Sequence, residues 1–227
     1  MSIRPSAKRP SSSQLQDSTG GAEKEIRQGV NLADAAKRSR VSHFVYSSVG
    51  WADRNTGIPH FDSKFQIEEH LRGTGLPYTI LRPVFFMENW LGAREQIEQG
   101  TLALPLASET RLQMIAVDDI GAFAAMAFDN PGKWQGQAIE LAGDELSMNE
   151  IAQALGRASG REVRYVTMPW DEFEQRAGRE MTTMYRWFQD VGYHVDIASL
   201  RTQYPDLKTF EHWLRANWQT ARSAVAQ

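Results

Sequence analysis

The chain has 227 residues, of which 41% are hydrophobic and 23% charged, so it can bury a sizeable core in one or two domains. Its 25 Lys and Arg residues against 28 Asp and Glu residues give a formal charge of −3, which disfavours nucleic-acid binding because proteins of that class are usually strongly basic. The absence of cysteine excludes disulfides, thiolate metal sites and cysteine nucleophiles, and it predicts a reducing, cytoplasmic compartment. No stretch approaches the roughly 20 apolar residues of a membrane span, so we expect a soluble protein without membrane contact.

Residues 1–22 form a polar N-terminal segment that is rich in Ser, Pro, Gly and Gln. With almost no apolar side chains, this segment cannot offset the entropy that it would lose on ordering, so we predict a disordered tail. Arg4, Lys8 and Arg9 make the tail basic. A basic arm is able to contact phosphate or acidic partners, although a solvated tail is the more common outcome.

Residues 23–131 alternate between helical periodicity and short runs that are apolar throughout. Strands of that composition, separated by helices, are typical of a parallel sheet that is covered on both faces. This part is therefore predicted to be α/β, with Asp118 and Asp119 as the N-cap of its last helix. The predicted helices span residues 23–40, 59–71 and 120–128, and the predicted strands span residues 41–46, 76–81 and 112–117.

Residues 132–227 have a looser pattern, which predicts a smaller, α-rich lobe that serves as a substrate-binding part or lid on the sheet. Ser147 and Glu150 have the spacing of a capping box and predict a helix that begins there and runs to residue 158. The other predicted elements are strands at residues 137–141 and 161–166, and helices at residues 170–176, 180–191 and 207–224.

The carboxyl ends of the predicted strands carry side chains that are able to bind a ligand, and open parallel sheets bind ligands at that edge. Ser47 and Ser48 end the first strand, where paired hydroxyls can hydrogen-bond a ribose or a carbonyl oxygen. Serines are also common where a strand simply turns into a loop, and that alternative stays open. The second strand is followed by residues 83–86, and the third by Asp118 and Asp119.

His60 and Lys64 are four residues apart on a predicted helix, so an imidazole and an ammonium group project from one face. Near a cofactor, such a lysine can hold ribose hydroxyls, and such a histidine can transfer a proton near neutral pH. The alternative is a solvated helix face on which Glu68, four residues beyond Lys64, is its ion-pair partner. The histidines have no metal-ligand spacing, so no metal site is predicted.

Three motifs resemble the NmrA-like family of atypical short-chain dehydrogenase/reductases: VYSSVG at residues 45–50, HFDSK at residues 60–64, and TILRP at residues 79–83 with Glu88 and Asn89 beyond it. Beyond these motifs, a looser resemblance to the family covers about residues 25–220. The resemblance implies a Rossmann-type domain that binds NADP or NAD, and a small C-terminal lobe. Some members of that family reduce quinones or related carbonyls, whereas others are non-catalytic redox sensors or regulators.

By position, the resemblance implies that Lys64 reaches the nicotinamide ribose of the cofactor. It also implies that His60 stands where active short-chain dehydrogenases carry the tyrosine of a Y-x-x-x-K motif. Because an imidazole is a different acid from a phenol, standard tyrosine acid catalysis is not expected. The remaining cofactor contacts that the resemblance implies are the strand-end hydroxyls and the wall beside the nicotinamide, at Ser47, Ser48, Pro83, Phe86 and Asn89.

The sequence departs from the family pattern at its start, where the family has a strand, a G-x-x-G-x-x-G turn and a helix that holds the pyrophosphate. Gly20 and Gly21 follow no apolar strand and lack that spacing. We therefore expect a truncated chain with a partial NAD(P)-binding domain at residues 23–131, an incomplete Rossmann-type parallel sheet and weak dinucleotide affinity. The strand at residues 41–46 would then have an exposed apolar edge, which predicts aggregation, a homo-oligomer or pairing with a partner protein.

These observations leave three functional hypotheses. The first is an NAD(P)H-dependent oxidoreductase that acts on a small molecule, a quinone or related carbonyl, through Lys64 and His60. The second is a non-catalytic redox sensor or regulator that acts through partner binding, which the His60 replacement and the basic arm favour. The third is a truncated fragment without a function of its own. The choice between NAD and NADP stays open.

Overall fold

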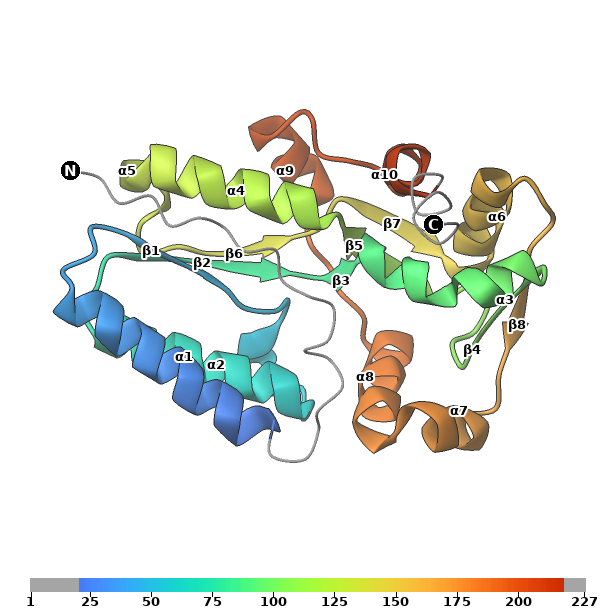
Figure 1. The fold of residues 1–227 in the computed structure, drawn as a ribbon, viewed down its shortest axis with the longest axis horizontal. Coiled ribbons are helices and arrows are strands. Elements are labelled where there is room, and N and C mark those ends of the chain that lie inside the picture. Colours follow the sequence, from blue (N-terminus) through green and yellow to red (C-terminus); the bar gives the residue numbers. More distant parts are fainter. Residues whose placement is uncertain (1–20, 219–227) are drawn as a thin grey trace, which may run out of the picture.

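The computed structural model describes residues 21–218, which form a mixed α/β structure of three small sheets and the helices around them (Figure 1). Most of the segment predicted to be disordered, residues 1–20, lies outside the described residues. Its last two residues, Gly21 and Ala22, instead begin helix α1, Gly21–Arg38. The acidic first turn and the basic last turn of α1 complement the dipole of the helix.

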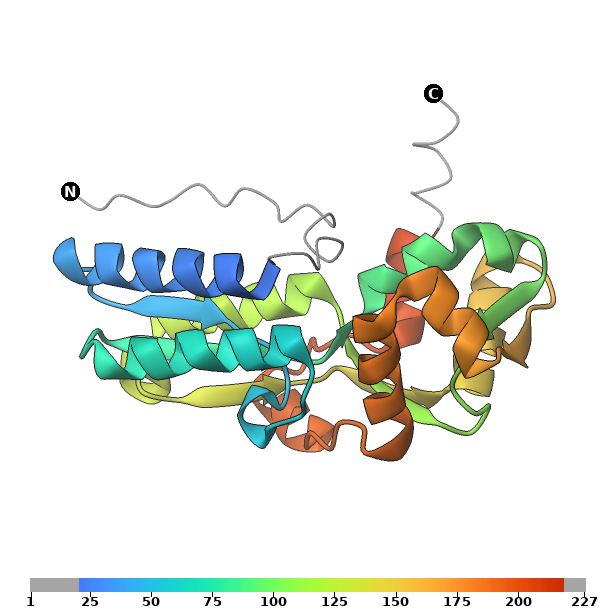
Figure 2. The same ribbon diagram turned by 90° about the horizontal axis from the view of Figure 1, so that it is seen from below.

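The first sheet contains three parallel strands in the order β1-β2-β6. Helices α1 and α2 cover one face and α4 covers the other (Figures 1 and 2). Ile80 and Leu81 follow each other in β2 and are both buried, Ile80 in the cluster beneath α1 and α2 and Leu81 in the main core. This alternation confirms the predicted parallel sheet with helices on both faces. The elements are β1 (Phe44–Ser47), α2 (Pro59–Gly73), β2 (Tyr78–Pro83), α4 (Val117–Asp129), α5 (Pro131–Trp134) and β6 (Ala138–Leu141).

Two further sheets continue the structure toward the right of Figure 1. In the second sheet, β5 pairs in parallel with β3 and antiparallel with β7, and in the third sheet β4 and β8 pair in parallel. Helix α3 packs against β4, α6 against β8, and α7 against α8. The strands are β3 (Phe85–Phe86), β4 (Thr101–Leu104), β5 (Arg111–Ile115), β7 (Asp144–Ser147) and β8 (Arg164–Thr167). The helices are α3 (Arg94–Glu98), α6 (Met148–Ser159), α7 (Trp170–Ala177), α8 (Arg179–Asp190), α9 (Ile197–Gln203) and α10 (Phe210–Asn217).

Helix α6 begins at the capping box that the sequence predicts. The backbone N of Glu150 donates to the Ser147 hydroxyl over 3.2 Å, and the backbone N of Ser147 donates to the Glu150 carboxylate over 2.7 Å. These two bonds satisfy donors that a helix start otherwise leaves without a partner. The helix ends at Ser159, and the C-cap that follows, Gly160, has a φ of 72°, in the left-handed region that favours glycine.

Asp118 and Asp119 do not cap helix α4, so that prediction is wrong. The helix begins at Val117 with Ala116 as its N-cap, and both aspartates lie in the first turn. Asp119 is buried, and its carboxylate accepts two hydrogen bonds from Lys208. Nζ of Lys208 donates over 2.7 Å, and the backbone N of Lys208 donates over 2.9 Å. The local pattern predicts that the Asp119 carboxylate caps the helix. In the structure it instead binds Lys208, which lies far along the chain.

The division of the chain at residue 131 into a dinucleotide-binding domain and a smaller lobe stays a prediction. Strand β6 lies beyond that residue and pairs with β2 of the first sheet, whereas β4 lies before it and pairs with β8. The last predicted helix, residues 207–224, is observed as α10, and residues 219–224 lie outside the described residues.

Gly50 lies in the loop after β1, where there is no room for a side chain. A Cβ atom there would lie 2.9 Å from Cε1 of the buried Tyr193 and 3.2 Å from Cγ1 of Val84. We expect Gly50→Ala to lower the free energy of unfolding by about 1–3 kcal/mol, because the loop and the ring must move apart. Urea denaturation measures this loss. The control is Gly73→Ala, whose Cβ would meet no atom within 4 Å, and equal stability of the two variants would contradict the prediction.

Candidate active site at the carboxyl end of the first sheet

Two serines stand at the carboxyl end of β1. Ser47 is exposed, whereas Ser48 is buried and its backbone N donates to the Leu81 carbonyl over 2.7 Å. The Ser48 hydroxyl has no hydrogen-bond partner among the described residues. Buried hydroxyls without a partner are rare, and this one lies at the sheet edge where parallel sheets bind ligands.

His60 and Lys64 lie in the first two turns of α2, which begins at Pro59. Proline suits this position because its missing N–H would have no partner in the helix. Nδ1 of His60 lies 2.7 Å from Oε1 of Glu180 on α8, and Nζ of Lys64 lies 2.6 Å from Oε1 of Glu25 on α1. Each candidate catalytic side chain is thus bound by a carboxylate from a different element, and each is one-quarter exposed.

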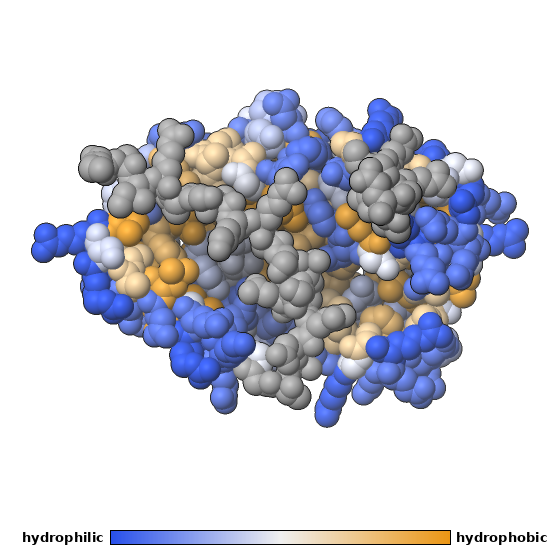
Figure 3. All heavy atoms as spheres, viewed as in Figure 1, coloured by the Kyte–Doolittle hydropathy of each residue, from blue (hydrophilic) through white to orange (hydrophobic). Residues whose placement is uncertain are grey.

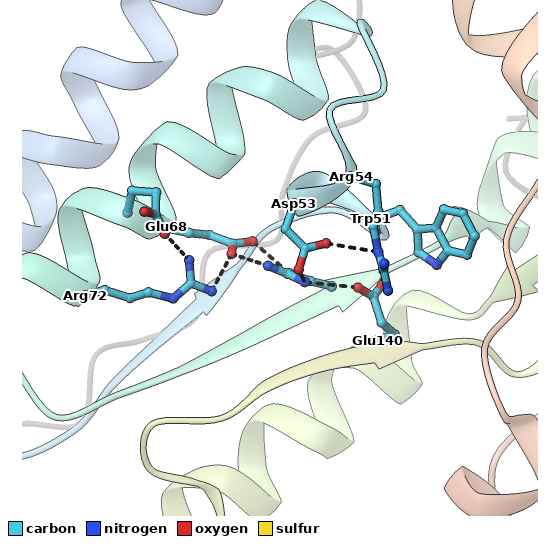
Figure 4. Close-up of polar contacts among 8 residues, drawn as sticks. Trp51, Asp53, Arg54, Glu68, Arg72 and Glu140 are labelled. Atoms are coloured by element: carbon cyan, nitrogen blue, oxygen red, sulfur yellow. Dashed lines mark hydrogen bonds and ion pairs between the residues drawn. The ribbon is translucent and has the colours of Figure 1, made fainter.

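Glu68 is not the partner of Lys64, so the ion pair expected from local spacing is wrong. The Glu68 side chain is buried beneath α2 and accepts hydrogen bonds from Nη2 and Nε of Arg82, over 2.6 and 3.0 Å (Figure 4). Nη2 of Arg72 donates to the same carboxylate over 2.9 Å. The two guanidinium groups outcompete a lysine because each can donate from its rigid planar fork.

The Arg82 guanidinium holds the loop between β1 and α2 in place. Its Nη1 lies 2.7 Å from the Asp53 carboxylate in the loop and 3.2 Å from Glu140 on β6 (Figure 4). Glu140 also accepts a hydrogen bond from the backbone N of Trp51 over 3.1 Å. Trp51 has a φ of 59°, which is unusual for a residue other than glycine, and these bonds stabilise it there.

Burial raises the pKa of Glu140 to about 7, and the contact with Arg82 only partly opposes that rise. The folded chain then binds more protons than the unfolded chain between about pH 4.5 and pH 7, so this group lowers stability as pH rises through that window. Glu140→Gln imitates the protonated form. We expect its stability relative to wild type to rise by on the order of 2 kcal/mol between pH 5 and pH 8. Urea denaturation at both pH values measures this, and a difference that is constant with pH would contradict it.

The other predicted cofactor residues lie along the chain that leaves β2. Pro83 is buried at the end of β2, Phe86 is half-buried in β3, and Asn89 is exposed in the 3-10 helix η3, Met87–Ala93. Their assignment to a wall beside the nicotinamide stays a prediction.

Glu88 makes polar contacts that its place in the sequence does not predict. Its Oε1 accepts hydrogen bonds from the backbone N of Val117 over 3.1 Å and from Nε1 of Trp213 over 2.9 Å. Its Oε2 is buried without a partner among the described residues, and burial raises the pKa of this carboxyl. Glu88 therefore joins η3 to α4 and α10. The signal in the sequence is a single acidic residue inside the apolar run FFMENWL.

The model of the NmrA-like family matches residues 14–214, which is most of the chain. The chain belongs to the NmrA-like family. Among curated relatives of this NmrA-like protein is an NAD(P)H azoreductase from Xenophilus azovorans, 34% identical over 161 residues, which are 66% of this chain and 53% of the relative. Another is the nitrogen metabolite repression protein nmrA of Emericella nidulans, 32% identical over 169 residues, which are 67% of this chain and 47% of the relative. The chain therefore spans about half the length of these relatives.

A solved structure with the same fold is the NADPH-dependent quinone oxidoreductase of Escherichia coli in complex with NADPH. The two structures superpose with a TM-score of 0.71 at 23% identity, and the match covers 89% of this chain and 74% of the other. This likeness confirms the Rossmann-type architecture that the sequence predicts.

Two further properties concern residues 21–218 alone. None of their helices has the length and apolar character needed to cross a bilayer. Within that range, no three His, Asp or Glu side chains gather as a metal site would require. The cytoplasmic location stays a prediction.

Proposed function

We propose that this NmrA-like protein binds NADPH or NADH and reduces a quinone or a related carbonyl compound. The observation that carries the proposal is the buried Ser48 hydroxyl at the carboxyl end of the parallel sheet, which has no partner within residues 21–218, with Lys64 and His60 at the start of α2. Support for the reaction class comes from the relative named as an azoreductase and the structure named as a quinone oxidoreductase.

The residues present fit the nicotinamide end of such a cofactor. The Ser48 hydroxyl has no hydrogen-bond partner among the described residues, and Lys64 has three N–H donors, of which the contact with Glu25 uses one. The chain has no glycines at the spacing of a pyrophosphate-binding turn, so we expect these contacts to supply most of the affinity. The exposed Ser47 and Asn89 add polar groups at the same end of the sheet.

When bound, the reduced nicotinamide supplies a hydride. Lys64 would hold the ribose hydroxyls and so orient the ring, and Phe86 would contribute to the wall beside it. Glu180 holds Nδ1 of His60, so in the imidazolium form Nε2 would be the nitrogen that gives a proton to the substrate oxygen as negative charge develops there, leaving the neutral imidazole. The carboxylate of Glu180 keeps the imidazole in this orientation.

The test is titration of the purified full-length protein with NADPH, followed by fluorescence and by thermal shift. We expect weak but saturable binding, a raised melting temperature and measurable turnover of a quinone. A folded protein that neither binds NADPH nor reduces a quinone would contradict the proposal. A cooperative thermal transition of the chain alone would contradict the third hypothesis, a fragment without a function of its own.

A second candidate function is regulation through partner binding, and the edge of the first sheet favours it. Within residues 21–218, β1 has β2 as its single neighbour. Phe44 and Ser48 direct their backbone N–H groups to β2, so by alternation those of Val45 and Ser47 face the open side. Hydrophobic side chains gather at the end of the molecule where β1 begins (left in Figure 3), and Val41 is exposed there.

The occupant that we expect at this edge is a second copy of the chain. The edge carries none of the charged or proline residues that usually prevent edge-to-edge pairing, and antiparallel pairing of two copies of β1 would satisfy the open backbone groups of both. Light scattering over a range of protein concentrations, together with a pull-down, tests this candidate. Finding neither self-association nor a partner would remove its basis.

A further inference from the structure

Helices α1 and α2 run side by side in the same direction and pack closely. A Cβ atom at Gly29 of α1 would lie 2.5 Å from Cδ1 of Ile67 on α2, so glycine allows the close approach. Close packing between the helices places the side chains of α1 at defined positions beside α2. Near the start of α2, the side chain that α1 brings to Lys64 is Glu25.

Glu25 is itself held from two sides. Its Oε1 lies 2.6 Å from Nζ of Lys64, and its Oε2 accepts a hydrogen bond from the Ser63 hydroxyl over 2.6 Å. Ser63 is buried, so the donor that fixes the carboxylate is ordered. Burial raises the pKa of Glu25, but the Lys64 charge and the hydrogen bonds from Lys64 and Ser63 outweigh this and hold that pKa below its ordinary value. The carboxylate is therefore charged at neutral pH.

We propose that Glu25 is a positioning residue, which with Ser63 holds the Lys64 ammonium so that its remaining N–H donors face the cofactor ribose. The inference rests on the proposed function of Lys64. A lysine side chain is flexible, and ordering it on binding lowers affinity. Glu25 orders the ammonium before the ligand arrives, without using all of its donors.

A second ion pair between the same helices provides the matched control. Oδ1 of Asp34 on α1 lies 2.8 Å from Nε2 of His70 on α2, and the exposed fractions of Asp34 and Glu25 are 40% and 35%. A merely structural role for Glu25 predicts that Glu25→Gln and Asp34→Asn have the same consequences. A positioning role predicts that Glu25→Gln alone changes Lys64 and cofactor binding.

The experiment has two readouts on the full chain. The first is the ¹⁵N NMR signal of the Lys64 ammonium without cofactor, which we expect to be ordered in wild type and in Asp34→Asn and mobile in Glu25→Gln. The second is NADPH titration, in which we expect about a tenfold loss of affinity for Glu25→Gln, a smaller loss for Ser63→Ala and none for Asp34→Asn. The quinone KM should stay unchanged, because Glu25 acts on the cofactor side.

The outcomes separate this inference from the proposed function. A Lys64 ammonium that is mobile in wild type, or unaffected by Glu25→Gln, overturns the inference even if NADPH binds. Unchanged NADPH affinity in a folded Glu25→Gln variant overturns it as well. An ordered Lys64 in a wild-type protein that does not bind NADPH overturns the proposed function, and the positioning role with it.

Discussion

Replacement of Arg82 by Met is expected to lower the free energy of unfolding by about 3–5 kcal/mol, a large part of the total for a domain of this size. Arg82 is buried among three carboxylates, and the Glu68 side chain is 0% exposed. Removing the guanidinium would leave Glu68 with Arg72 and Asp53 with Arg54 as their remaining cations, and it would take from Glu140 its contact with Arg82. Burial of uncompensated charge is the physical cause of the loss.

Urea or thermal denaturation of purified variants measures this effect. The control is Arg111→Met, because Arg111 also pairs with two carboxylates, those of Glu145 and Glu150, but is about half exposed and should contribute less than about 1 kcal/mol. Adding Glu68→Gln to Arg82→Met should recover part of the stability, because it removes one of the buried charges. A loss below about 1 kcal/mol for Arg82→Met would show that the network does not support the fold.

The second large effect is expected for Lys64→Met, which keeps the length of the side chain and removes its charge. Without the ammonium group, the cofactor ribose has no cationic donor at the start of α2, so we expect NADPH-dependent kcat/KM to fall about 10²-fold. Stability should change by only about 1 kcal/mol, because Lys64 is partly exposed. NADPH titration and quinone turnover at saturating cofactor separate binding from chemistry.

Two variants make this result specific. Lys37→Met removes an exposed lysine from α1 and should leave both binding and turnover unchanged. His60→Gln should keep NADPH affinity and lower kcat, because the imidazole is assigned to proton transfer rather than to the cofactor. Turnover that survives Lys64→Met would contradict the assignment, whereas loss of binding in Lys37→Met would point to a nonspecific effect of charge.

The periodicity of the sequence predicts the first sheet well and the second and third poorly. Strands β1, β2 and β6 carry apolar residues on both faces, and that composition is a signal in itself. Strands β3, β4 and β7 are not predicted. Strand β3 has only two residues, too few for any period to be recognised, and β7 carries the polar Asp144, Glu145 and Ser147, so it is not an apolar run. Asp119 is a second case that local spacing does not decide. Adjacent residues predict a helix cap, whereas the hydrogen-bond partner of its side chain is Lys208, far along the chain.

The sequence by itself determined the α/β class, the parallel first sheet, the capping box of α6 and the likeness to the NmrA-like family, because each depends on residues that are close along the chain. Only the tertiary structure decided which charges meet. In the structure, Lys64 pairs with Glu25 instead of Glu68, and Glu68 pairs with Arg82. The physical reason is burial. Once helices α1 and α2 pack on the sheet, a carboxylate that loses its water must pair with a cation that lies close in space, however far apart the two residues are along the chain.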